Sequence, residues 1–131
     1  MMLRKYALKM GIGMIKLKVV VEDKEFYPGN IIGGHFELEG GIFPIKIKRY
    51  DIDLVVNHFS NMKEDIINSH SVICSSILNA NEKKEVPFLL EIPLQAETIS
   101  GNKKYSVIAK VLLEYDQVLT EVKPIIIKEN C

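Results

Sequence analysis

The sequence predicts an all-β fold: an antiparallel immunoglobulin-like or arrestin-like β-sandwich of about seven strands. Three observations predict it. Apolar and polar residues alternate in several separate segments, the pattern of strands with one buried face. Loop-forming residues separate these segments at regular spacing, as in antiparallel sandwiches. A chain of 131 residues can form a core without disulfide bonds, so we expect residues 1–131 to form a single domain of this kind.

The alternating segments give the expected strands. They are residues 15–21, 32–39, 45–59, 72–78, 86–94, 105–115 and 119–128. Residues 57–71 are polar and ambiguous, and we expect mainly a loop there. A short N-terminal helix is expected over 3–10, because Leu3, Tyr6, Ala7 and Met10 share one helical face.

The longest strand carries a break in its alternation. Ile45 and Ile47 occupy odd positions, whereas the apolar residues from Tyr50 onward occupy even ones. One extra residue near Lys48 or Arg49 explains the change, either as a β-bulge or as a short turn.

Glycine and proline mark two further features. Pro28 followed by Gly29 favours a type II turn, because proline fixes φ and glycine permits positive φ. Gly33 and Gly34 within a strand indicate a bulge or a close approach of neighbouring backbone.

Composition excludes several classes of function. The 17 basic and 17 acidic residues give a net charge of zero, so no nucleic-acid surface is predicted. No apolar stretch approaches the ~20 residues that span a bilayer. Lysines interrupt residues 1–18 and no cleavage site follows, so we expect a retained segment and a cytoplasmic protein. Cys74 and Cys131 are expected to be reduced thiols.

Few residues suggest metal chemistry. His35 lies on the polar face of a strand and His58 at a strand end, so neither is expected to be a ligand. His70 and Cys74 share a strand face, but about 13 Å of extended chain separates them, too far for one metal ion. Asp51 and Asp53 also share a face; they could bind calcium or act as glycosidic acid and base, although a solvated face explains them.

No catalytic motif occurs. The sequence lacks a phosphate-binding glycine loop, a nucleophile elbow and a metalloprotease motif. No catalytic, cofactor-binding or metal-binding residue is therefore predicted, and the protein is not expected to be an enzyme.

Several segments together resemble the arrestin-fold family. The segments are Phe26-Tyr27-Pro28-Gly29 with Gly33-Gly34, Val86-Pro87-Phe88 through Ile92-Pro93, and 105–109. Gly11-Ile12-Gly13 and Gly40-Gly41 bring the chain nearest to the bacterial sporulation control proteins. The resemblance spans about residues 11–128 and covers a single, amino-terminal-type sandwich, whereas arrestin-like proteins usually contain two.

The resemblance implies a non-catalytic protein-interaction module, either a regulatory adaptor or a scaffold. Sandwich edges accept partner strands, and we expect edges at residues 86–94 and 119–128. A homodimer would cover the apolar face that a second sandwich normally meets. The candidate partner-binding residues are Val86, Phe88, Leu90, Lys46, Lys48 and Arg49. The basic run among them either protects an edge or binds an acidic partner.

The alternative is a ligand-binding sandwich for calcium or carbohydrate, centred on Asp51 and Asp53. The absence of tryptophan counts against carbohydrate.

Overall fold

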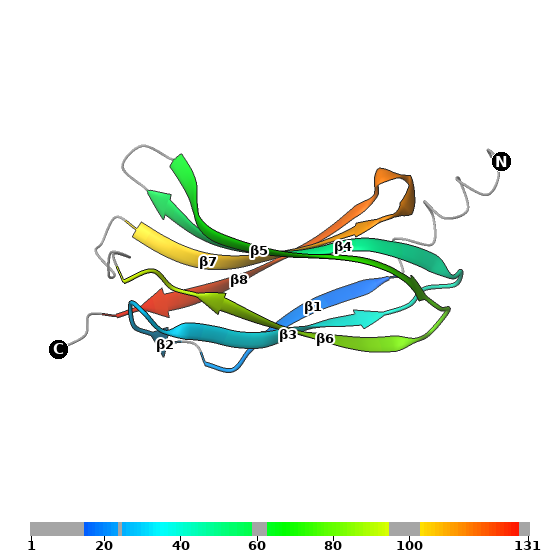
Figure 1. Ribbon diagram of the computed structural model, residues 1–131, viewed down its shortest axis with the longest axis horizontal. Coiled ribbons are helices and arrows are strands. Elements are labelled where there is room, and N and C mark those ends of the chain that lie inside the picture. The colour runs from blue at the N-terminus through cyan, green and yellow to red at the C-terminus, as the bar shows by residue number, and fades with distance from the viewer. Residues whose placement is uncertain (1–14, 24, 59–62, 95–102, 129–131) are drawn as a thin grey trace.

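A computed structural model describes residues 15–23, 25–58, 63–94 and 103–128 as two β-sheets packed face to face (Figure 1). One sheet has the order β1 (Lys16–Val21), β3 (Ile31–Glu39), β6 (Lys83–Glu91). The other has the order β2 (Glu25–Phe26), β8 (Val118–Ile127), β7 (Lys103–Leu113), β4 (Ile45–His58), β5 (Lys63–Leu78). All pairs are antiparallel except β2 with β8. The expected all-β sandwich is confirmed; the expected helix at 3–10 lies outside the described residues.

The core forms where the alternating apolar residues of both sheets meet. Ile32 from one sheet and Leu54 and Val107 from the other have no exposed surface. The ring of Phe36 lies 5.4 Å from that of Tyr50 across the sheets, and 5.4 Å from that of Phe88 beside it. Tilted aromatic contacts of this kind add about 0.5–1.5 kcal/mol each to the burial itself.

The break in β4 is a β-bulge and not a turn. Ile47 pairs with Leu113 of β7 and Arg49 pairs with the next residue, Leu112, so Lys48 is the extra residue. Because of the bulge, both Ile47 before it and Tyr50 after it point into the core.

The two glycine features are also resolved. Both glycines pair with β6 without a register shift, and Gly34 also pairs with Val21 of β1, so no bulge occurs there. A Cβ at Gly34 would overlap the Val20 carbonyl oxygen, which confirms a close backbone approach. At the expected type II turn, Gly29 has φ +86° and the Asn30 N–H donates to the Tyr27 carbonyl at 3.0 Å.

Two expectations about strands are wrong. Residues 63–71 belong to β5 and pair with β4, whereas the sequence suggested a loop. The inward positions of this part of β5 hold polar residues such as Asn68 and His70, opposite Leu54 and Ile52, which hides the alternation. β8 is not an open edge along its whole length, because its end pairs with β2 as well as with β7.

Candidate functional site

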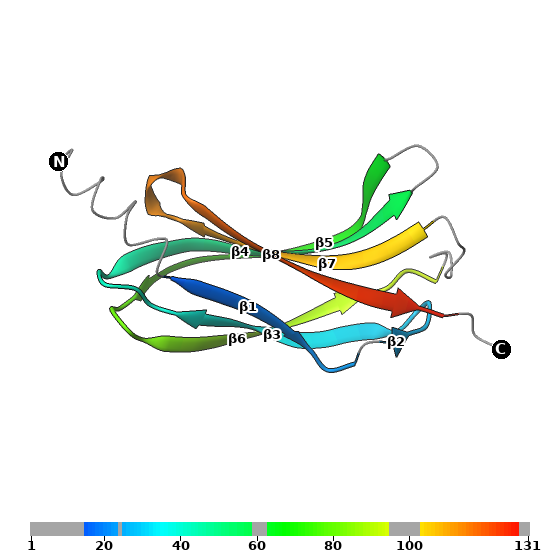
Figure 2. The same ribbon diagram turned by 180° about the vertical axis from the view of Figure 1, so that it is seen from behind.

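β5 forms one border of the five-stranded sheet, and β6 forms the border of the other sheet on the same side of the sandwich (Figure 1). Figure 2 shows β1 and β8 on the opposite side. The Asn68 side-chain amide donates to the Glu91 carbonyl at 2.8 Å, which links the two border strands. Within the described residues, no strand pairs with the free side of β5.

Most of β5 lacks the charges and prolines that normally protect an edge strand. Residues 66–78 contain no Asp, Glu, Lys, Arg, Pro or Gly. Natural edge strands usually carry charges, prolines or bulges that prevent pairing with other chains. β5 has two register shifts against β4: one between its pairs with Leu54 and Val55, near one end of this stretch, and one between its pairs with Ile47 and Arg49, at residues 73–76. From the first shift to the second, residues 66–73 form an edge that contains no Asp, Glu, Lys, Arg or Pro and is open to pairing.

The outward face of β5 carries three exposed isoleucines beside the outward Ser69 and Ser71. Ile66, Ile73 and Ile77 are 62%, 85% and 57% exposed. We call these three residues, together with Lys46 and Arg49 of β4, the β5 surface. Lys46 pairs with Ile77 and Arg49 with Ile73, so the two cations flank the two isoleucines on the same face.

The outer face continues across the sheet in rows of paired residues. One row consists of Ile73, Arg49, Leu112 and Val118, and another consists of Ser69, Asp53, Ile108 and Val122. The five-stranded sheet curves away from the other sheet at both ends, so this face is concave (Figure 1). On this face, Val55 and Asp53 are only 1% and 9% exposed although they point outward.

Asp51 has a structural role on this face. Its carboxylate accepts a hydrogen bond from Arg49 Nε at 3.0 Å and another from Ser71 Oγ at 2.6 Å. Both carboxylate oxygens are thus engaged, and the bond to Ser71 joins β4 to β5. Asp51 and Asp53 belong to no group of three or more potential ligands among the described residues. The geometry gives no support to calcium binding here.

The predicted partner-binding residues fall into two sets. Phe88 and Leu90 are 6% and 1% exposed, and Val86 packs against the core, so these side chains point inward. The outward position between Phe88 and Leu90 is Leu89, which is 68% exposed. Only the backbone of β6 and its outward side chains are open to a partner.

The basic run occupies a different position from the one expected. Lys46, Lys48 and Arg49 are exposed, but they lie on β4, an interior strand, and so protect no edge. The structure instead brings Lys46 and Arg49 beside β5. This neighbourhood could not be predicted, because the alternation along one strand does not give its register with the next strand.

A small polar group lies between the sheets behind β5. The buried Tyr50 hydroxyl makes no well-formed hydrogen bond, although the Ser76 side chain lies near enough to interact with it. Burial raises the pKa of Tyr50 to about 12; the nearby Cys74 adds to the rise and the Ser76 hydroxyl opposes it. Cys74 is a free thiol, half-buried, with Sγ 3.8 Å from the Ile47 carbonyl oxygen. Cys131 lies outside the described residues.

His70 and Cys74 both lie on β5. They belong to no shared group of potential ligands in the described parts of the chain. His58 at the end of β4 has its Nε2 3.2 Å from Asp65 Oδ2, which joins β4 to β5 near their connecting loop.

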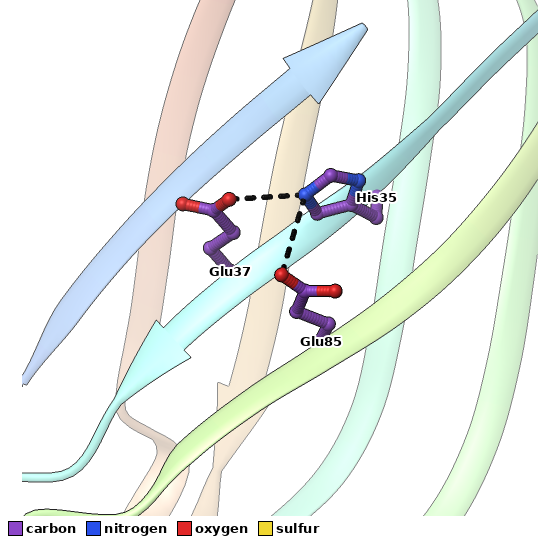
Figure 3. Close-up of side chains that lie close together, drawn as sticks. All are labelled: His35, Glu37 and Glu85. Atoms are coloured by element: carbon purple, nitrogen blue, oxygen red, sulfur yellow. Dashed lines mark hydrogen bonds and ion pairs between the residues drawn. The ribbon is translucent and has the colours of Figure 1, made fainter. Parts of the chain in front are cut away.

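His35 has neighbours that sequence analysis did not foresee. Its Nε2 lies 3.0 Å from Glu37 Oε1 and 3.9 Å from Glu85 Oε1, on the outer face of the three-stranded sheet (Figure 3). Glu85 belongs to β6, where it pairs with Glu37. The alternation placed His35 and Glu37 on one face, but the register of β3 with β6 was needed to add Glu85.

The chain matches known proteins over most of its length. The family model described as SpoOM protein matches residues 3–116. The sporulation-control protein Spo0M of Bacillus subtilis (strain 168) is 23% identical over 134 residues, covering 92% of this chain and 52% of that protein. The crystal structure of Spo0M, described as a sporulation control protein, from Bacillus subtilis superposes with a TM-score of 0.82 at 19% identity, covering 90% of this chain and 51% of the other.

The extent of these matches shows which family the chain belongs to. The chain spans about half the length of the relatives that it matches. The described part of the chain includes no helix that is long and apolar enough to cross a membrane. The family model covers well over half of the sequence, and the structural match reproduces the sandwich. The chain belongs to the SpoOM protein family.

Proposed function

We propose that this chain is a non-catalytic regulatory module that acts by binding another protein through the β5 surface. The observation that carries the proposal is the open edge of β5. Its residues 66–78 include no Asp, Glu, Lys or Arg, and three of them are exposed isoleucines. Extended segments add to such edges through backbone hydrogen bonds, and side chains on alternate positions provide specificity. The name of the Bacillus relative, a sporulation-control protein, supports a regulatory role.

The partner that suits this edge is a second copy of the chain. Two β5 strands related by a two-fold axis would pair antiparallel, each meeting the same surface of the other. A charged edge would repel its own copy, whereas residues 66–78 bring no Asp, Glu, Lys or Arg into the pairing. Ile73 would lie near the centre, since it is close to the middle of this stretch. The homodimer then forms one continuous sheet from two five-stranded sheets.

The proposal also includes two expectations from the sequence. It treats residues 1–131 as one domain, which the single hydrophobic cluster of the described residues supports. It places the protein in the cytoplasm, which the two-cysteine composition supports.

Analytical ultracentrifugation of the Ile73→Lys variant tests the proposal. Ile73 is 85% exposed, so the substitution leaves the monomer fold intact. We expect the wild type to form dimers and the variant to dimerise at least about tenfold more weakly, a change of about 1.4 kcal/mol. Leu89→Lys is the matched control, because Leu89 is also exposed but lies on β6.

Three outcomes would reject the proposed dimer. They are a wild type that remains monomeric at high concentration, an Ile73→Lys variant that dimerises like the wild type, and a Leu89→Lys variant that is weakened equally. If the wild type is monomeric, it could still bind a different protein through the β5 surface. A complex that Ile73→Lys abolishes and Leu89→Lys retains would show this, and the second copy would then be rejected as the partner.

A further inference from the structure

The outer face of the three-stranded sheet holds a group of side chains that no part of the proposed function uses. His35 and Glu37 stand two residues apart on β3, and Glu85 faces Glu37 from β6. One ligand atom from each of the three residues lies within 4.8 Å of the other two. Figure 3 shows one nitrogen of the His35 ring facing both carboxylates. All three are carried by paired strands, which fix their Cα positions.

The spacing of these atoms suits a small divalent ion. In a tetrahedral zinc site with bonds of about 2.0–2.1 Å, neighbouring ligand atoms are about 3.3–3.5 Å apart. The distances from His35 Nε2 to Glu37 Oε1 and Glu85 Oε1, 3.0 and 3.9 Å, bracket this value. Side-chain exposure of 40% for Glu37 and 72% for Glu85 leaves both carboxylates room to adjust.

The repulsion between two neighbouring carboxylates favours the binding of a cation. Glu37 and Glu85 are direct cross-strand partners, and like charges in that position destabilise a sheet. A divalent ion between them would replace this repulsion with two favourable bonds. It would also tie the border strand β6 to β3.

Nearby lysines limit which ion can bind. Lys16, Lys18, Lys83 and Lys84 line the same hollow as Glu37 and Glu85, and Lys18 pairs with Glu37. Their charges oppose an ion held by electrostatic attraction alone, such as calcium or magnesium. An imidazole nitrogen favours ions that form stronger bonds with nitrogen, such as zinc, nickel or copper.

We infer that His35, Glu37 and Glu85 form a binding site for a divalent transition-metal ion of the zinc class. Three protein ligands leave the fourth position of the ion for water. Because two of the ligands are exposed carboxylates, the site binds more weakly than a closed site of four cysteine and histidine ligands.

Calorimetric titration with zinc chloride tests the inference on the full chain. We expect one zinc ion per chain, with affinity at least tenfold lower in His35→Ala and in Glu85→Gln. His70→Ala is the control, since His70 is an exposed histidine on β5 in the other sheet, and it should bind like the wild type. Magnesium chloride should give no binding at the same concentrations.

A second readout separates metal loss from misfolding. Zinc should raise the melting temperature of the wild type and of His70→Ala, while His35→Ala and Glu85→Gln should melt at temperatures that zinc does not change. Two results would overturn the inference: absence of zinc binding to the wild type, and His35→Ala binding zinc as tightly as the wild type. Neither result bears on the β5 surface, which lies on the other sheet.

Discussion

Replacing Tyr50 by phenylalanine removes a buried hydroxyl that makes no well-formed hydrogen bond and interacts only weakly with the Ser76 side chain. The ring, which is 5% exposed and packs 5.4 Å from the Phe36 ring, is retained. A buried polar group without a partner costs about 1–3 kcal/mol, and part of that cost disappears with the hydroxyl. We therefore expect Tyr50→Phe to be more stable than the wild type at pH 8, by about 0.5–1.5 kcal/mol.

The same hydroxyl makes stability depend on pH. Burial raises the pKa of Tyr50 from 10.0 to about 12, so the unfolded chain loses this proton first as the pH rises. The phenol is neutral in both states well below pH 10, and the free energy of unfolding then falls as the pH rises from 10 toward 12. With these two pKa values, linkage predicts a loss of about 1.4 kcal/mol at pH 11. Burial also raises the pKa of Tyr105, whose contribution both proteins share.

Urea unfolding of both proteins at pH 8, 9, 10 and 11 measures the effect. The difference in free energy of unfolding between Tyr50→Phe and the wild type should stay constant to pH 9 and then grow by about 1–1.4 kcal/mol at pH 11. A difference that is independent of pH would refute the buried, neutral phenol. A Tyr50→Phe variant clearly less stable than the wild type at pH 8 would show that the hydroxyl has a partner.

Two further substitutions test the backbone of the fold. Gly34→Ala should lower the free energy of unfolding in urea by about 2–3 kcal/mol, because its Cβ would overlap the Val20 carbonyl oxygen. Gly33→Ala should lower it by under about 1 kcal/mol, because its Cβ meets only the far end of the Glu22 side chain. Equal losses would contradict the close backbone approach at Gly34. Tyr115→Asn should raise the melting temperature by about 2–5 °C. Tyr115 has φ +61° in the turn between β7 and β8, and asparagine tolerates this backbone conformation better than tyrosine. An unchanged or lower melting temperature would contradict backbone strain at Tyr115.

Much of the fold could be predicted from the sequence because the inward positions of most strands are apolar. The change of phase around Lys48 even located the bulge, since a buried face tolerates no slip in alternation. β5 was predicted only in its second half. Its first half places Asn68 and His70 inward, near the border of the sandwich, where polar side chains reach solvent or the neighbouring backbone.

The candidate sites were harder to predict because they depend on pairing between strands. The basic residues Lys46 and Arg49 were recognised, but their position beside Ile77 and Ile73 follows from the register of β5. Phe88 and Leu90 were expected to meet a partner, yet the alternation that identifies their strand also turns them inward.

The His35 group shows the same limit. Glu85 is 50 residues from His35 in the chain, and only the pairing of β3 with β6 brings them together. Local alternation places a side chain on a face of its sheet, but it does not identify that side chain's neighbours on the next strand.

Amide hydrogen exchange in β5, followed by NMR at low and high protein concentration, tests the central claim most directly. The claim is that the free edge of β5 is the working surface of the protein. If so, amides of residues 66–78 that point away from β4 exchange more slowly as concentration rises, while amides of β6 do not change. The claim would be contradicted if the amides of β5 exchanged at the same rate at every protein concentration and if no bound partner protein changed that rate.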